Sequence, residues 1–92
     1  MYYVYFLKLA NNQIYTGMTG DLKRRISEHE HGKVASTCKR RPLSLIGYEA
    51  YLLKSDAVRR EKYLKTTEGK RLFRQQYRDI ITTDLENSDV GQ

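Results

Sequence analysis

Apolar and polar residues alternate along the first eighteen positions of the chain. Residues 2–9 and 13–18 are rich in tyrosine and aliphatic side chains, a composition that favours extended strands. Residues 10–12, between them, are one alanine and two asparagines, which tolerate turn conformations. Alternation resumes over residues 43–53, directly after Pro42. The pattern predicts an N-terminal β-hairpin and, later in the chain, a third strand.

The segment that follows the hairpin has helical periodicity. Leu22 and Ile26 lie four positions apart within residues 21–31, so that both face one side of a helix. Thr19 or Asp21 is available as the N-cap. We therefore expect a helix here, packed on the sheet through its apolar stripe.

Two more helices are predicted in the second half of the chain. Residues 55–66 begin with Ser55, a suitable N-cap, and Asp56, which is well placed against the helix dipole. Residues 68–78 place their apolar side chains on one face. The stretch of residues 33–42 has no apolar period and is expected to be a loop.

The expected element order is therefore β-β-α-β-α-α, an α+β fold with a small three-stranded antiparallel sheet flanked by helices. A chain of 92 residues supports a single core, which we place in residues 1–78. Residues 79–92 lack basic side chains and periodicity, and are expected to form an acidic, flexible C-terminal tail.

The composition also indicates in which cellular compartment the protein is found. No apolar run approaches the length of a membrane span, and the N-terminus does not resemble a targeting signal. Cys38 is the only cysteine, so that no intramolecular disulfide and no cysteine-based zinc site can form. We expect a cytoplasmic protein without membrane partners.

The charge is distributed unevenly along the chain. All 17 Lys and Arg residues lie within residues 1–78 together with seven of the 11 acidic residues, which gives this segment a net charge of +10. A small domain with this field favours a polyanion such as nucleic acid as its partner. The basic residues expected to contact nucleic acid are Lys23, Arg24, Lys39, Arg40, Arg41, Arg59, Arg60 and Lys62.

Two adjacent arginines of the first predicted helix differ in position. On a helical wheel, His29 joins the buried stripe of Leu22 and Ile26, Arg25 lies at the edge of that stripe, and Arg24 faces water. Arg25 is therefore the arginine held near the core. Its position has two interpretations, a functional guanidinium or a long stem that runs past the helix edge.

Glu61 lies in the middle of the apolar face of the second predicted helix, with Ala57 and Leu64 on one side of it and Val58 on the other. A carboxylate on such a face is costly unless it is paired, hydrogen-bonded or bound to a cation. The partner is either a nearby Arg or Lys or a hard divalent metal, which takes oxygen ligands and retains bound water.

The predicted hairpin carries several tyrosines that can pack or act chemically. Tyr3 and Tyr5 share one face of the first strand, and Tyr15 lies in the second. The turn does not fix the register, so the sequence leaves open whether Tyr5 and Tyr15 share a face. Gly17 weakens its strand unless another group must approach closely.

The spacing of these residues resembles the GIY-YIG nuclease superfamily. The resemblance rests on residues 3–5 (Tyr-Val-Tyr), residues 15–17 (Tyr-Thr-Gly), Arg25, His29 and Glu61. The match covers about residues 2–78. The chain is similar to a small stand-alone form of the N-terminal catalytic domain found in excision-repair nucleases.

The resemblance implies a role for each matched residue. Arg25 would stabilise the phosphate, and Glu61 would hold a single divalent metal, Mg²⁺ or Mn²⁺. Tyr5 and Tyr15 would orient or deprotonate the attacking water, and His29 matches a position that is often His or Tyr. The implied activity is metal-dependent hydrolysis of phosphodiester bonds in nucleic acid, with DNA favoured over RNA.

Met18 stands where some relatives carry a lysine that could assist proton removal, and residues 62–86 contain no asparagine to match one that some members place after the glutamate. Two other functions therefore stay open. One is a catalytically weak or inactive nucleic-acid-binding module of the same fold. The other is a protein-interaction scaffold in which Glu61 only pairs with a basic side chain.

Overall fold

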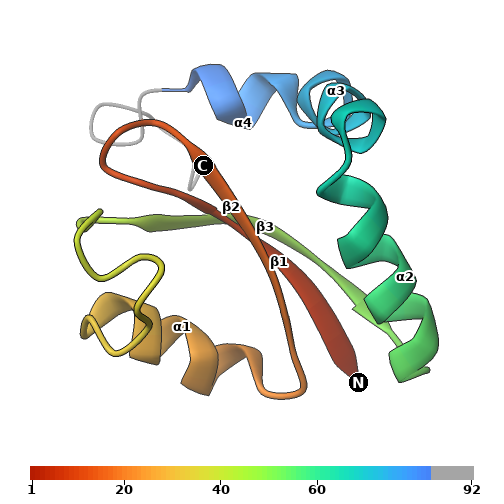
Figure 1. Ribbon diagram of the computed structural model, residues 1–92, viewed down its shortest axis with the longest axis horizontal. Helices are drawn as coiled ribbons and strands as arrows, with labels where there is room; N and C mark the ends of the chain where they lie inside the picture. Colours follow the sequence, from red (N-terminus) through yellow and green to blue (C-terminus); the bar gives the residue numbers. More distant parts are fainter. Residues whose placement is uncertain (84–92) are drawn as a thin grey trace, which may run out of the picture.

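A computed structural model describes residues 1–83 of the chain and shows a three-stranded antiparallel sheet in the order β2-β1-β3 (Figure 1). The strands are β1 (Tyr2–Lys8), β2 (Ile14–Thr19) and β3 (Ser44–Tyr51). β1 is the central strand and pairs with both neighbours. The predicted hairpin and third strand are therefore confirmed.

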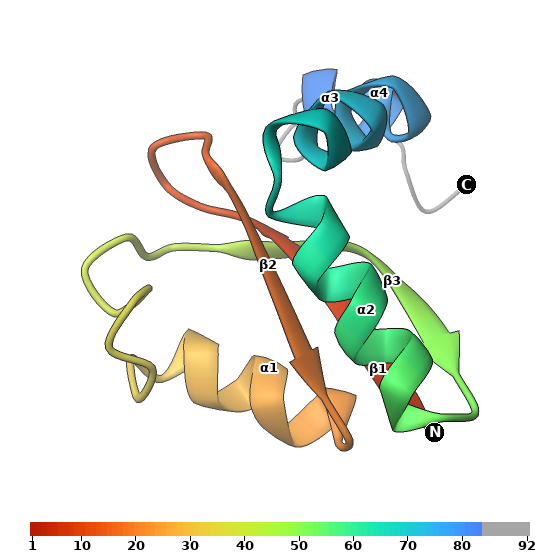
Figure 2. The ribbon, with the colours of Figure 1, turned by 45° about the vertical axis from the view of Figure 1, so that its right-hand side comes forward.

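Helices cover both faces of this sheet, as Figures 1 and 2 show from two directions. In the described part of the chain they are α1 (Leu22–Glu30), α2 (Lys54–Leu64), α3 (Thr67–Gln76) and α4 (Arg78–Thr82). α2 packs against all three strands on the face opposite α1. Within residues 1–83, no helix has both the length and the apolar character needed to cross a bilayer.

The central strand supplies the core on both sides. Val4 and Phe6 are fully buried against α2 and α3, whereas Tyr5 and Leu7 are buried toward α1. This alternation follows from the two-residue period of a strand. Because both faces of β1 are covered, its sequence is apolar throughout its centre, and Tyr5 brings a polar atom into this interior.

The structure corrects one helix start and confirms another. Asp21 is the N-cap of α1, and its carboxylate accepts a hydrogen bond of 3.1 Å from the backbone N–H of Arg24. The prediction that Ser55 caps the second helix is wrong, because α2 begins at Lys54 after Leu53, whose carbonyl accepts from the Ala57 N–H at 3.4 Å. Ala57, which makes this bond, is fully buried in the first turn of α2.

The first part of the expected tail is helical. Residues 78–82 form α4, and Ile81 packs against the core. The Lys8 ammonium donates to the carbonyls of Ile81 and Thr83, at 3.1 and 3.3 Å. These contacts attach the segment to β1, although its sequence has no clear helical period. The rest of the expected tail, residues 84–92, lies outside the described residues.

Candidate functional site

The hairpin register places both candidate tyrosines on the same face. Tyr5 is opposite Gly17 and Leu7 is opposite Tyr15, so all four residues face α1. The ring centroids of Tyr5 and Tyr15 are 6.3 Å apart. The question that the turn sequence left open is thereby answered.

Gly17 is the position that lets the Tyr5 side chain lie across β2. A Cβ atom added to Gly17 would overlap the phenol oxygen and ring of Tyr5. A glycine within a strand predicts that another group lies close to its backbone, and here that group is the Tyr5 ring. As a result, the Tyr5 hydroxyl extends over the neighbouring strand toward α1.

The imidazole of His29 is hydrogen-bonded to the Tyr5 hydroxyl on one side and to the Thr37 hydroxyl on the other. Its Nε2 atom lies 2.8 Å from Tyr5 Oη, and its Nδ1 atom lies 2.8 Å from Thr37 Oγ1. His29 and Thr37 are both fully buried. The imidazole also packs edge-on against Tyr15, with centroids 5.1 Å apart. We call these three hydrogen-bonded residues the Tyr5–His29–Thr37 chain.

The protonation of this chain follows from its burial. Burial lowers the pKa of His29, and the positive charge of Arg25 lowers it further, so the imidazole is neutral at physiological pH. Burial also raises the pKa of Tyr5 to about 12, although the Arg25 guanidinium opposes this shift. Tyr5 therefore retains its proton at neutral pH, next to an imidazole that can accept it.

Arg25 lies between the buried chain and solvent, as the helical wheel predicts. Its side chain is 35% exposed and its Nη1 donates to Glu28 Oε1 at 3.0 Å, whereas Arg24 is exposed. Hydrogen bonding to Tyr5 and to Glu28 raises the pKa of Arg25. A permanently charged guanidinium thus lies next to the phenol, with part of its surface open to a ligand.

Glu61 lies on α2, and its ion-pair partner Lys65 lines the same cavity as Tyr15. Of the effects that shift the pKa of Tyr5, the charge of Glu61 is the smallest, and it raises that pKa. The Glu61 side chain is 21% exposed, and Oε2 accepts from Lys65 Nζ at 3.1 Å. Lys65 is thus the basic partner of Glu61 that the sequence leaves open. Because the Lys65 side chain is 55% exposed, its separation from the carboxylate costs little free energy.

The donor set at Glu61 fits one kind of metal ion. The part of the chain that the structure describes holds no group of three or more His, Cys, Asp or Glu residues suited to a metal. A single accessible carboxylate suits Mg²⁺, which often binds through one or two carboxylates and takes its other oxygens from water and phosphate. Zinc, which requires three or four protein ligands, does not fit this set.

The eight basic residues expected to contact nucleic acid are in different environments. Arg41 donates to the backbone carbonyls of Cys38 and Glu30 and so fastens the loop to the end of α1. Arg40 reaches the Gln13 side chain at 3.5 Å. All eight are exposed except Arg60, which is half-buried. Of the five remaining residues, Lys23 and Arg24 lie on α1, Lys39 lies in the loop, and Arg59 and Lys62 lie on α2.

Arg60 is bound within the protein. Its Nε and Nη2 atoms donate to the two carboxylate oxygens of Glu49 at 2.9 and 3.2 Å. The hydroxyls of Tyr51 and Tyr77 donate to the same carboxylate at 2.7 and 2.9 Å. We call these four residues the Glu49 cluster. Its hydrogen bonds join β3, α2 and the end of α3, so the geometry assigns Arg60 to the structure of the protein.

Thr37 and Lys65 contact candidate site residues, His29 and Glu61, but the sequence does not single them out. Thr37 lies in a loop without periodicity, and no local pattern indicates that its hydroxyl is buried. Lys65 is four positions after Glu61, and this spacing on a helix was a usable signal for an ion pair.

The chain is similar to known proteins over most of its length. Residues 1–77 match the family described as the GIY-YIG catalytic domain. A UPF0213 protein of Staphylococcus haemolyticus is 44% identical over 66 residues, which are 71% of this chain and 80% of that protein. A UPF0213 protein of Staphylococcus epidermidis is 39% identical over the same shares.

A solved structure has the same fold. The solution NMR structure of a UPF0213 protein from Bacillus halodurans superposes with a TM-score of 0.57 and 32% sequence identity. The alignment covers 96% of this chain and all of the other. With the family match over residues 1–77, these similarities show that the chain belongs to the GIY-YIG family of nuclease-type domains.

Proposed function

We propose that the protein is a metal-dependent endonuclease that hydrolyses phosphodiester bonds of nucleic acid, with DNA as the favoured substrate. The observation that carries this proposal is the meeting of Tyr5, Tyr15, Arg25 and His29 on one face of the hairpin, with Glu61 paired to Lys65, which lines the same cavity as Tyr15. Phosphoryl transfer requires cationic groups for the phosphate and a route for the proton of water.

In this proposal, Arg25 binds the phosphate and neutralises the charge that develops on its oxygens. Arg25 is suited to this role because its guanidinium is permanently charged and partly exposed. A divalent ion on Glu61 would add further neutralisation of the phosphate.

The Tyr5–His29–Thr37 chain supplies the route for the proton. As water attacks phosphorus, its proton passes to the Tyr5 oxygen while the Tyr5 proton passes to Nε2 of neutral His29. Tyr5 alone would be a poor base because its pKa is raised to about 12. For this transfer the Thr37 hydroxyl must accept the proton of His29 Nδ1, which leaves Nε2 free to accept. Tyr15, packed on the same imidazole, orients the water.

A cleavage assay tests the proposal directly. The wild-type chain is incubated with duplex, branched and single-stranded DNA and RNA, with Mg²⁺, with Mn²⁺ or with a chelator. We expect cleavage only in the presence of the metal, and loss of cleavage in Arg25→Ala with the fold intact by circular dichroism. Binding without cleavage under every metal condition would contradict the proposal.

The Glu61–Lys65 ion pair supports a second candidate, a binding module without nuclease activity. In that module Lys65 occupies the carboxylate permanently and Glu61 serves only α2. Mg²⁺ titration followed by NMR separates the two candidates. The nuclease predicts Mg²⁺-dependent shifts at residues 61–65, whereas the binding module predicts none.

A further inference from the structure

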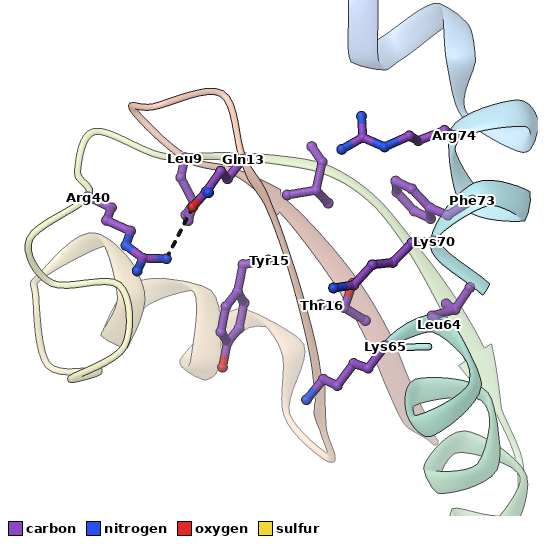
Figure 3. Close-up of a pocket in the computed structure, with 11 residues that line it drawn as sticks. Leu9, Gln13, Tyr15, Thr16, Arg40, Leu64, Lys65, Lys70, Phe73 and Arg74 are labelled. Carbon is purple, nitrogen blue, oxygen red and sulfur yellow. Dashed lines mark hydrogen bonds between the residues drawn. The ribbon is translucent and has the colours of Figure 1, made fainter. Parts of the chain in front are cut away.

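A hollow of about 400 Å³ lies along β2, one of the two outer strands of the sheet, beside the candidate site (Figure 3). This volume is within the range of pockets that enclose a small ligand. Its apolar lining includes Leu9, Leu64 and Phe73, all of which are buried, together with Ile14 of β2. The hollow therefore offers a bound group some apolar surface beside polar lining residues.

Basic side chains surround this floor from two directions. Arg40 comes from the loop on one side, and Lys65, Lys70 and Arg74 come from the end of α2 and from α3 on the other. Figure 3 shows these side chains extending toward β2. Among residues 1–83, no acidic side chain lines the hollow. Its ligand must therefore carry negative charge as well as an apolar surface.

Tyr15 connects the hollow to the candidate site. It lines the hollow and also packs edge-on against His29, while Lys65, which lines the hollow too, binds Glu61. A chain molecule whose phosphate lies at Arg25 would thus place its next unit within reach of the hollow.

We propose that this basic hollow binds one unpaired nucleotide of a single strand, next to the phosphate that is cleaved. The phosphate of that nucleotide contacts the basic rim and its base covers the apolar floor. A paired base is stacked within its duplex and enters such a hollow only after it leaves the stack. The inference rests on the proposed nuclease function and adds to it the substrate class, nucleic acid with an unpaired segment.

Binding measurements on the full chain test this inference. All variants carry Glu61→Gln to prevent cleavage, and their affinities for a labelled oligothymidylate, an oligouridylate and a DNA duplex of equal length are measured by fluorescence anisotropy over a range of salt concentrations. The test variant is Lys70→Ala/Arg74→Ala. The matched control is Arg71→Ala/Arg78→Ala, which removes the same charge from the same region outside the hollow.

We expect the test variant to bind oligothymidylate at least about tenfold more weakly than its parent, with the salt dependence reduced by about 1.4 in the log–log slope for two lost contacts. The control should change affinity by less than about threefold, because only the long-range field differs. Duplex affinity should be equal in the two double variants. Tighter binding of oligouridylate, lost in the same variant, would support the hollow and favour RNA as its ligand.

Equal weakening of single-strand binding in the test and control variants would overturn the inference, as would equal loss of duplex and single-strand affinity in the test variant. The result is independent of the proposed activity. If the wild type does not cleave but the hollow binds single strands, the nuclease proposal fails alone. If the wild type cleaves and the test variant binds normally, the hollow inference fails alone.

Discussion

The hydroxyl of Tyr5 is linked through His29 to Thr37, a residue of the loop between α1 and β3. All three side chains are buried, so each polar atom depends on its neighbour for a hydrogen bond. Gly17 provides the space for the first of them. In the proposed mechanism, Tyr5 and His29 therefore depend on Gly17 and Thr37 for their positions.

Replacement of Thr37 tests the positioning role of its hydroxyl. In Thr37→Val the Nδ1 atom of His29 loses its partner, and we expect the single-turnover cleavage rate to fall by about tenfold or more. Thr37→Ser should restore the rate because it restores the hydroxyl. The ¹⁵N chemical shifts of His29 should show the tautomer change in the valine variant. A valine variant with wild-type rate and tautomer would remove Thr37 from the mechanism.

Replacement of Gly17 tests the packing of Tyr5. A Cβ at this position overlaps the phenol, so Gly17→Ala should lower the free energy of unfolding by about 1–3 kcal/mol and reduce cleavage. Gly20→Ala is the matched control, since a Cβ there meets no atom within 4 Å. Urea unfolding of both variants provides the measurement. Equal stability of the two variants would contradict this role of Gly17.

At the level of elements, the order and the faces of the strands and helices were predictable because they depend on periodicity. Leu22 and Ile26 pack beside Tyr5 as their spacing predicts. The start of α2 and the presence of α4 were not predictable, because burial of Ala57 and the contacts of Lys8 with Ile81 are tertiary interactions. The burial of Thr37 was not predictable for the same reason, because it also results from tertiary contacts.

The Glu49 cluster gives an element-level prediction of pH dependence. Burial alone would raise the pKa of Glu49, but hydrogen bonds from Arg60, Tyr51 and Tyr77 hold it below its ordinary value. A depressed pKa in the folded state means that the cluster stabilises the fold above the unfolded pKa of about 4.3. This contribution is lost as the pH falls through the lower, folded pKa.

We therefore expect Glu49→Gln to lower the free energy of unfolding at pH 7 by about 1–3 kcal/mol. Its difference from wild type should shrink progressively below about pH 4. Glu30→Gln, at the exposed end of α1, is the control and should change stability by less than about 0.5 kcal/mol. The free energies of unfolding of wild type and both variants are measured by denaturant unfolding from pH 7 to below pH 4. A difference that is constant with pH would mean that the carboxylate charge does not contribute.

At the level of the whole molecule, the proposed site lies beside β2, one of the two edge strands of the sheet. α1 brings Arg25 and His29, α2 brings Glu61, and the hairpin brings Tyr5 and Tyr15. The net charge of +10 in residues 1–78 surrounds this edge with a field that attracts polyanions. Five residues spread over 57 positions of the chain thus meet only after the sheet and the helices on both of its faces have formed.

The single-turnover cleavage rate of Glu61→Gln at saturating Mg²⁺ tests the central claim most directly. Glu68→Gln, an exposed glutamate of α3 outside the site, serves as the matched control. We predict that Glu61→Gln folds normally but cleaves at least about a thousandfold more slowly, while the control cleaves at the wild-type rate. Cleavage by Glu61→Gln at the rate of the control would contradict a metal-dependent mechanism centred on this carboxylate.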